Sequence, residues 1–445
     1  MNYKVFFETL GCAKNQVDTE VMIGLLDKNS YIMTPDVEEA DIIAVNTCGF
    51  IESAKAESIE IILELSTYKT EGKCQMLIVT GCLAERYAEA LKIEIPEIDV
   101  FIGTGSFDEI IPIIDKVLRK ESHGGALIEK GDINKDFSEN LPRILMTPTY
   151  MAYLKIAEGC DNCCTYCIIP KLRGKYRSRK FEDVVLEAQT LVSKGVKELI
   201  IIAQDITRFG EDLYGTYRLA DLLYELNKIE GLKWIRLQYC YPDVVDDKLI
   251  EAIAKCDKVA KYIDIPIQHC NDFMLKRMNR TTSKASIVAL IEKLRAAVPE
   301  ISIRSTLITG FPGETEEMFN ELLEFVKEQR LDKLGAFAYS LEEDTAAANF
   351  KDHLETEVKE ARRDEILELQ QQISTELMYR KVGKTLDVLI EEEVPGEKIY
   401  VGRTEYDAPE IDGVVYVHTE RALRIGQFVK VKITDALEYD LIGEL

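Results

Sequence analysis

Short apolar runs alternate with amphipathic segments over the first 120 residues. Segments such as 15–27, 50–66 and 105–119 have the 3.6-residue spacing of helices. The apolar runs between them have the length and composition of buried strands: YKVFF (3–7), DIIAV (41–45), QMLIV (75–79) and DVFIG (99–103). Because strands that alternate with helices form parallel sheets, residues 1–120 are predicted to be a small parallel α/β domain.

A second and longer alternation follows a polar stretch, 121–148, that is predicted to be a linker. Residues 149–350 contain six predicted strands separated by five predicted helices. The strands are 153–158, 198–203, 234–239, 262–266, 302–308 and 335–340, and the helices are about 182–195, 217–229, 245–256, 283–297 and 314–330. Six βα units are too few to close an eight-stranded barrel, so we expect an open, partial (β/α)6 TIM barrel.

The last hundred residues change their hydrophobic period. Residues 351–382 are predicted to be a connecting helix, with Ile366, Leu369, Ile373 and Leu377 on one stripe that packs against the barrel. After Gly383 the apolar positions recur at every second residue in short runs. Residues 383–445 are therefore predicted to be a small antiparallel β-barrel.

Composition narrows the class of protein. The chain has no segment that is apolar enough to span a bilayer and does not begin with an export signal, so we expect it to be cytoplasmic, without a membrane partner. Its 11 cysteines are then expected to be metal ligands or buried thiols rather than disulfides. The net charge of −24 repels polyanions over most of the surface, although a local basic patch can overcome this.

The stretch GCDNCCTYCIIPKLRG carries four thiols in eight residues. If all four bind, a zinc site is one interpretation, but paired zinc knuckles need an intervening loop. If Cys163 is a spare, Cys160, Cys164 and Cys167 form CxxxCxxC, which can ligate three irons of a [4Fe–4S] cluster and leave the fourth iron open. This spacing after the first barrel strand closely resembles the signature of the radical S-adenosylmethionine superfamily.

Three further cysteines come just after predicted strands of the first domain. Cys12, Cys48 and Cys82 each lie beside a glycine at the carboxyl end of a strand, the edge where parallel sheets bind ligands. Each alone could be a small buried hydrophobe. Together they predict a second cluster site with three cysteines. No comparable placement is found for Cys74, Cys240, Cys256 and Cys270.

Several longer motifs together resemble the methylthiotransferase family of radical S-adenosylmethionine enzymes over essentially the whole chain. They are LGCAKNQVD, VNTCGFIESAK, VTGCLAERY, GCDNCCTYCIIPKLRGKYRSR, AQDITRFGEDLY, GFPGETEE and VGRTEYDAPEIDGVVYV. The resemblance implies an N-terminal domain with an auxiliary [4Fe–4S] cluster on Cys12, Cys48 and Cys82, a radical S-adenosylmethionine partial barrel, and a C-terminal barrel called TRAM.

The family has two well-known branches. The MiaB branch modifies an adenosine of transfer RNA, and the RimO branch modifies an aspartate of small-subunit ribosomal protein number twelve. CGFIESAK and RTEYDAPEIDGVVYV are more similar to the RimO branch. Charge favours the same branch, because residues 383–445 contain 14 acidic and seven basic residues, a net of −7, which suits a basic protein substrate better than RNA. An acidic surface that merely aids solubility is the alternative.

The resemblance also implies the chemistry. S-adenosylmethionine bound at the Cys160/Cys164/Cys167 cluster is cleaved to a 5′-deoxyadenosyl radical, which takes hydrogen from an unactivated carbon. The auxiliary cluster carries the sulfur, a second S-adenosylmethionine methylates it, and the product is β-methylthio-aspartate. An electron donor such as flavodoxin or ferredoxin is implied as a partner. The alternatives are a transfer-RNA enzyme of the MiaB type, an iron–sulfur carrier or electron-transfer protein, and a zinc scaffold.

The remaining predicted cofactor contacts lie at strand ends, and no catalytic side chain is assigned. Gln204 and Asp205 end the second barrel strand, Gly310, Gly313 and Glu314 form the turn after the fifth, and Arg304 could pair with the cofactor carboxylate. The run KLRGKYRSRK (171–180) is typical of a solvated surface, or here of a segment that holds an anionic cofactor or the target aspartate. His269 is interpreted as a hydrogen-bonded barrel residue.

Overall fold

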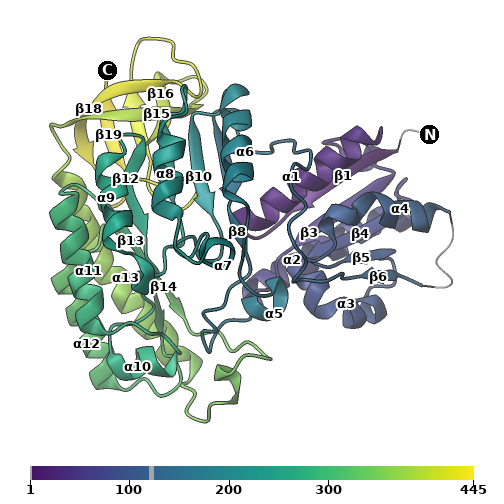
Figure 1. Ribbon diagram of the computed structural model, residues 1–445, viewed down its shortest axis with the longest axis horizontal. Coiled ribbons are helices and arrows are strands. Elements are labelled where there is room, and N and C mark those ends of the chain that lie inside the picture. The colour runs from purple at the N-terminus through teal and green to yellow at the C-terminus, as the bar shows by residue number, and fades with distance from the viewer. Residues whose placement is uncertain (1–2, 120–124) are drawn as a thin grey trace.

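The computed structural model describes residues 3–119 and 125–445, which form two parallel sheets and a closed barrel. Figure 1 shows the N-terminal sheet on one side of the central sheet and the C-terminal barrel at one end of it. This three-part architecture confirms the predicted fold class. In the described ranges, no helix is long and apolar enough to cross a membrane.

The N-terminal sheet is six-stranded and entirely parallel, in the order β2-β1-β3-β4-β5-β6. Its central strands are fully buried because helices pack on both faces. The strands are β1 (Lys4–Thr9), β2 (Ile32–Met33), β3 (Ile42–Thr47), β4 (Met76–Gly81), β5 (Val100–Ile102) and β6 (Leu127–Glu129). The helices are α1 (Ala13–Lys28), α2 (Glu52–Thr70), α3 (Cys82–Glu94) and α4 (Ile110–Leu118). Strand β6 lies within the stretch that the sequence predicts to be a linker.

The central sheet is also six-stranded and parallel, in the order β14-β13-β12-β11-β10-β7. Its two end strands do not pair, so the sheet is an open barrel, as predicted. The strands are β7 (Met151–Lys155), β10 (Glu198–Ile202), β11 (Trp234–Leu237), β12 (Val259–Asp264), β13 (Ser302–Thr309) and β14 (Lys333–Ala338). A separate hairpin pairs β8 (Ala157–Glu158) with β9 (Arg177–Ser178).

Helices cover the outer face of this sheet and form the largest hydrophobic core with it. They include α6 (Phe181–Ser193), α8 (Leu219–Asn227), α9 (Asp247–Lys255), α11 (Lys284–Ala297) and α12 (Glu316–Gln329), with short helices α5 (Ile169–Arg173), α7 (Glu211–Tyr214) and α10 (Asp272–Arg277) in the connections. The connecting helix is α13 (Thr356–Tyr379). Ile366 and Ile373 are buried in the same core, which confirms the predicted packing stripe.

The C-terminal barrel has five strands, in the order β15-β16-β17-β19-β18. They are β15 (Thr385–Glu393), β16 (Ile399–Thr404), β17 (Val415–His418), β18 (Phe428–Ala436) and β19 (Leu441–Glu444). Four of the neighbouring pairs are antiparallel, as predicted, but β17 and β19 pair in parallel. The parallel pair closes the barrel, because the chain crosses through β18 before β19 returns beside β17.

Buried ion pairs fasten this barrel to the amino-terminal ends of the central strands. Glu198 accepts hydrogen bonds from Arg236 at 2.7 Å and from Arg403 at 2.6 Å, and all three side chains are fully buried. Lys333 Nζ lies 2.7 Å from Asp407 Oδ1. The C-terminal barrel is therefore attached to the central domain through buried ion pairs.

We expect acid to weaken this attachment through Asp407. Burial raises the pKa of Asp407, but the charges of Lys333 and Lys381 outweigh it and hold the pKa at about 2. A carboxyl pKa depressed in the folded state stabilises the protein above the unfolded pKa and loses that contribution as pH falls. The pair should thus contribute roughly 2 kcal/mol above pH ~4, lost between pH ~4 and ~2.

The measurement is the difference in unfolding free energy between the wild type and Asp407→Asn across that pH range. The difference should shrink as the solution is acidified. Lys398→Gln is a suitable control, since Lys398 belongs to an exposed pair with Glu420. A difference that stays constant from pH 5 to pH 2 would show that the Asp407 charge contributes nothing to the attachment.

Candidate functional site

Cys12, Cys48 and Cys82 meet at the carboxyl edge of the N-terminal sheet. Cys12 is the N-cap of α1, Cys48 follows the last residue of β3, and Cys82 is the first residue of α3. Strands β1, β3 and β4 are adjacent, with Thr9 opposite Asn46 and Thr47 opposite Gly81. The parallel topology thus brings together three cysteines that are far apart in the sequence.

Glycines allow these cysteines to approach one another closely. A Cβ atom on Gly11 would lie 2.9 Å from Cys48 Cβ, and one on Gly49 would lie 2.9 Å from the Cys82 carbonyl carbon. Gly11 also has φ of +92°, in the left-handed region that favours glycine. Larger residues at either position would force the three cysteines apart.

The surroundings of Cys48 and Cys82 favour the neutral form of these two thiols. Burial raises the pKa of Cys82 to about 11; the Arg173 charge opposes the rise, and Cys12 and Cys48 add to it. Burial likewise raises the pKa of Cys48. Thiolates at this edge would need a positively charged group among them, which is the electrostatic requirement of a metal centre.

The second cysteine group, which consists of Cys160, Cys164 and Cys167, lies on the loop between β8 and α5. The loop is held by hydrogen bonds from Cys160 N to Gly174 O at 3.1 Å and from Cys167 N to Cys164 O at 3.0 Å. Burial raises the pKa of Cys160 to about 12, and Asp205 and Cys164 add to the rise. Burial also raises the pKa of Cys167, and the largest further contribution comes from Cys164.

Cys163 differs from the three cysteines around it. Its residue is exposed, whereas Cys160, Cys164 and Cys167 are partly buried. Its backbone adopts φ of +50°, and its carbonyl accepts a hydrogen bond from Asn279 Nδ2 at 3.0 Å. Cys163 thus differs from its neighbour Cys164 in exposure and in backbone conformation, and its role as a spare stays a prediction.

Helix α5 joins the two cysteine groups. Cys82 packs against Ile168 and Leu172, which follow directly after the second group. Thr104, after β5, donates a hydrogen bond to the Leu172 carbonyl at 2.5 Å. Cys82 of the first group therefore contacts the segment that follows Cys167 of the second.

The last residue of α5, Arg173, is the centre of a buried polar network. Its guanidinium donates to Asp18 at 2.6 Å, to Asn15 at 2.5 Å and to Glu158 at 3.3 Å, and the side chain is 3% exposed. Lys155 Nζ donates to Glu158 at 2.8 Å and also bonds Asp18. This network connects α1 of the first domain to β7 and β8 of the central domain.

The sequence pattern did not indicate this network. Asn15 and Asp18 fall in LGCAKNQVD, and Arg173 falls in the run 171–180. Burial raises the pKa of Glu158, but the charges of Lys155 and Arg173 outweigh it and hold that pKa far below its usual range. The sequence nevertheless held one signal for this network: the basic run 171–180 follows the cysteine motif 160–167, and Asp18 follows Cys12 in the other motif.

Two of the other predicted residues lie beside the second cysteine group. Gln204 Nε2 donates to Glu158 at 2.6 Å. Asp205 is buried and accepts from Asn162 Nδ2, within the cysteine loop, at 3.0 Å and from Thr207 N at 2.9 Å. The structure therefore brings Gln204 and Asp205 to the cysteine loop and to the network.

The turn after β13 is held against α13. Both carboxylate oxygens of Glu314 accept from Gly310 N at 3.1 Å, and Arg362 of α13 donates to Glu314 at 2.7 Å. His269 Nε2 lies 3.3 Å from the same carboxylate. A Cβ atom on Gly310 would lie 2.1 Å from Lys359 Cγ, so this glycine permits close packing. Gly313 has φ of +86° in the same turn.

Arg304 points along the inner face of β13 toward acidic groups. Its guanidinium lies 3.6 Å from Asp264 on β12 and 3.5 Å from Asp412 of the C-terminal barrel. The side chain is partly buried. Arg304 is thus surrounded by two carboxylates of the protein itself.

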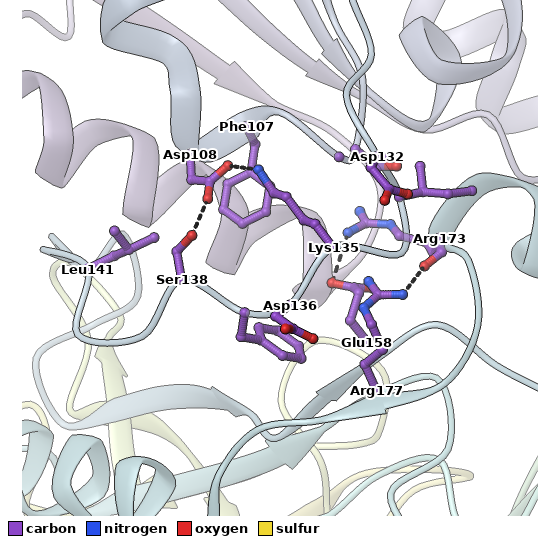
Figure 2. Close-up of a pocket in the computed structure, with 14 residues that line it drawn as sticks. Phe107, Asp108, Asp132, Lys135, Asp136, Ser138, Leu141, Glu158, Arg173 and Arg177 are labelled. Carbon is purple, nitrogen blue, oxygen red and sulfur yellow. Dashed lines mark hydrogen bonds and ion pairs between the residues drawn. The ribbon is translucent and has the colours of Figure 1, made fainter. Parts of the chain in front are cut away.

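A small cavity borders the Arg173 network. Figure 2 shows Asp108 and Ser138 on one side and Arg173, Glu158 and Arg177 on the other. Lys135 reaches Asp108 at 2.5 Å across it. Its volume of about 50 Å³ holds a few water molecules and is far below the ~300 Å³ of small-molecule sites. The cavity is therefore too small for S-adenosylmethionine.

Comparison with family models defines the class of protein. Residues 4–103 match the uncharacterized protein family UPF0004, residues 154–326 match the radical SAM superfamily, and residues 382–445 match the TRAM domain. The chain is thus a radical SAM protein with an N-terminal UPF0004 domain and a C-terminal TRAM domain. These domains imply S-adenosylmethionine and iron–sulfur clusters as cofactors.

Relatives over the full length specify the family. The chain is 53% identical over 442 residues to the ribosomal protein uS12 methylthiotransferase RimO of Clostridioides difficile, covering 99% of this chain and 98% of that protein. It is 51% identical to the RimO protein of a Thermoanaerobacter species, covering 98% of each. The chain belongs to the RimO family of radical SAM methylthiotransferases, as the sequence motifs predicted.

Solved structures share the fold at low identity. The radical S-adenosylmethionine methyltransferase TsrM from Kitasatospora setae, with cobalamin and a [4Fe–4S] cluster bound, aligns with a TM-score of 0.57 at 13% identity. The alignment covers 90% of this chain and 81% of that chain. The cobalamin-dependent radical enzyme OxsB aligns with a TM-score of 0.53 at 14% identity, over 84% of this chain and 56% of that one. This likeness concerns the fold alone.

Proposed function

We propose that this protein transfers a methylthio group to the β-carbon of an aspartate in ribosomal protein uS12. It would use two [4Fe–4S] clusters, one on Cys160, Cys164 and Cys167 and one on Cys12, Cys48 and Cys82. The observation that carries the proposal is that Cys82 of one group packs against Ile168, which directly follows Cys167 of the other group. The family relationship supports the same substrate and reaction class.

Among the described residues no three side chains are placed to share a single metal ion, so each cysteine group would instead hold a cluster, in which every cysteine binds its own iron. Burial raises the pKa of Cys48, Cys82, Cys160 and Cys167, so bound iron would be needed to keep these four as thiolates. Three cysteines in each group would leave one iron without a protein ligand. When bound, the clusters and S-adenosylmethionine supply the radical and the sulfur that no side chain could provide.

The protein's own residues then position and shield these groups. Asp205 and Gln204, beside the cysteine loop, are proposed to contact S-adenosylmethionine, together with Gly310 and Gly313 of the turn after β13. Glu314 would support that turn through its hydrogen bonds from Gly310 N. Arg304, on the inner face of the sheet, would pair with the carboxylate of S-adenosylmethionine. Arg173 and its partners would fix the N-terminal domain against the central one.

The TRAM module is proposed to dock the basic substrate through its exposed acidic residues. The net charge of −7 for the whole module is larger than the charge of its exposed surface, because Asp407 and other acidic side chains face the central domain. Nine acidic and six basic side chains of the module are exposed, a net of −3. That balance still disfavours phosphate binding, so transfer RNA is not the proposed substrate. A small redox protein such as flavodoxin or ferredoxin is proposed as electron donor, in the cytoplasm.

The test is product analysis. Anaerobically reconstituted protein is incubated with S-adenosylmethionine, a reductant and either uS12 or transfer RNA, and both substrates are analysed by mass spectrometry. We expect a methylthio group on one aspartate of uS12 and none on the RNA. Cleavage of S-adenosylmethionine with methylthiolated adenosine, or with no methylthiolated product, would refute the proposed substrate.

A further inference from the structure

Lys14 of α1 is a largely buried lysine with no carboxylate partner among the described residues. The residue is 8% exposed, and its Nζ lies 3.6 Å from the centre of the Tyr239 ring. Across residues 3–119 and 125–445, Lys14 forms no ion pair, and the partner of its side chain is Tyr239. Buried charges are normally paired, so this lysine departs from the rule.

Other lysines with similar burial follow the rule in this protein. Lys155 contacts Glu158 at 2.8 Å, and Lys333 contacts Asp407 at 2.7 Å. Removing a lysine side chain from water costs more than one cation–π contact returns, so the Tyr239 ring alone does not offset the burial of Lys14.

Lys14 lies where the two domains face each other. It follows Cys12 by two residues, and its helix neighbours Ala13 and Val17 pack against the inner face of the central sheet around Tyr153. Figure 1 shows α1 between the N-terminal and central sheets. Tyr239, directly after β11, has φ of +68° and donates its backbone N–H to Asp264 at 3.3 Å. The Lys14 ammonium thus lies beside Tyr239, at the inner face of the central sheet, two residues after Cys12 of the first cysteine group.

We propose that Lys14 binds the side-chain carboxylate of the substrate aspartate and thereby determines specificity for an acidic residue. This inference rests on the proposed function. The β-carbon that receives the sulfur is bonded directly to the carboxyl carbon, so a cation beside Cys12 would hold the reacting carbon next to the sulfur-bearing group. An adenine base is neutral and would leave the ammonium unpaired.

The methionyl carboxylate of S-adenosylmethionine has the same chemistry, so the two sources must be separated. S-adenosylmethionine is expected at the Cys160/Cys164/Cys167 group, whereas Lys14 adjoins Cys12. We therefore expect Lys14→Met to weaken peptide binding more than S-adenosylmethionine binding. A larger loss in S-adenosylmethionine affinity, measured by equilibrium binding, would overturn the assignment to the substrate.

The experiment uses reconstituted, unreduced enzyme and two labelled peptides. One peptide carries the uS12 aspartate that the product analysis identifies, and the other carries asparagine in its place. Fluorescence anisotropy should show that the wild type binds the aspartate peptide about 10- to 100-fold more tightly, as a charge-assisted hydrogen bond predicts. Lys14→Met should bind both peptides with the weaker affinity, and Lys14→Arg should restore part of the preference.

Controls separate binding from folding and from the proposed function. Lys28→Met removes an exposed lysine from the same helix and should keep the wild-type preference. Lys14→Gln is measured in parallel, and iron content and thermal midpoint establish that each variant is loaded and folded. A preference for aspartate that survives in Lys14→Met overturns this inference alone. A wild type that methylthiolates neither peptide nor uS12 overturns the proposed function as well.

Discussion

Cys82→Ala is expected to abolish methylthiolation of uS12 while the cleavage of S-adenosylmethionine persists, whereas Cys164→Ala is expected to abolish both. The two cysteines belong to groups with different proposed roles. Loss of a ligand should remove the chemistry of its own cluster and spare the other. The measurement is formation of 5′-deoxyadenosine and of methylthiolated uS12 in the same reaction.

Cys163→Ala is the matched control. Cys163 is adjacent to Cys164 but is exposed, and its backbone has a reversed φ. We expect this variant to retain both products at close to wild-type rates. Loss of both reactions in Cys82→Ala would mean that the two groups do not act separately, and loss in Cys163→Ala would contradict the division into three ligands and a spare.

Arg173→Leu should lower the free energy of unfolding by about 3–5 kcal/mol. The substitution removes the guanidinium from Asp18, Asn15 and Glu158. Lys155 would then be the one remaining cation for two buried carboxylates in that network. Breaking a buried network by removing one partner leaves an uncompensated charge, which is why the expected cost is large.

The stability is measured by urea unfolding followed by circular dichroism. Arg119→Leu is the comparison, because Arg119 forms an exposed pair with Asp115 and should contribute at most about 1 kcal/mol. Arg173→Leu should also lose iron from the N-terminal group, since Arg173 adjoins Cys82. Equal losses of stability in the two variants would show that the Arg173 network does not hold the domains together.

The pattern of apolar residues was sufficient to predict the sheets. DIIAV and QMLIV read as buried strands because both faces of β3 and β4 are covered, so most positions are apolar; the buried polar residues Asn46, Thr47 and Thr80 lie toward their carboxyl ends. The convergence of Cys12, Cys48 and Cys82 followed from the same topology, since parallel strands end at one edge. The short edge strand β6 has little apolar pattern of its own and was not predicted.

Contacts between distant segments could not be predicted in this way. Arg173 lies in a basic run that is typical of a solvated surface, yet it is buried because Asp18 and Glu158 reach it from other segments. Glu314 was predicted to contact the cofactor, and the structure shows its carboxylate bonded to Gly310 and Arg362. The sequence contains the charges, but only the fold decides which of them meet.

The protein is proposed to hold two iron–sulfur clusters, each on three cysteines. Iron and sulfide analysis with Mössbauer spectroscopy on reconstituted protein tests this proposal most directly. The account predicts two [4Fe–4S] clusters in the wild type and one in each triple variant, with alanine at Cys12, Cys48 and Cys82 or at Cys160, Cys164 and Cys167. A wild type with a single cluster, or a triple variant that keeps both, would contradict it.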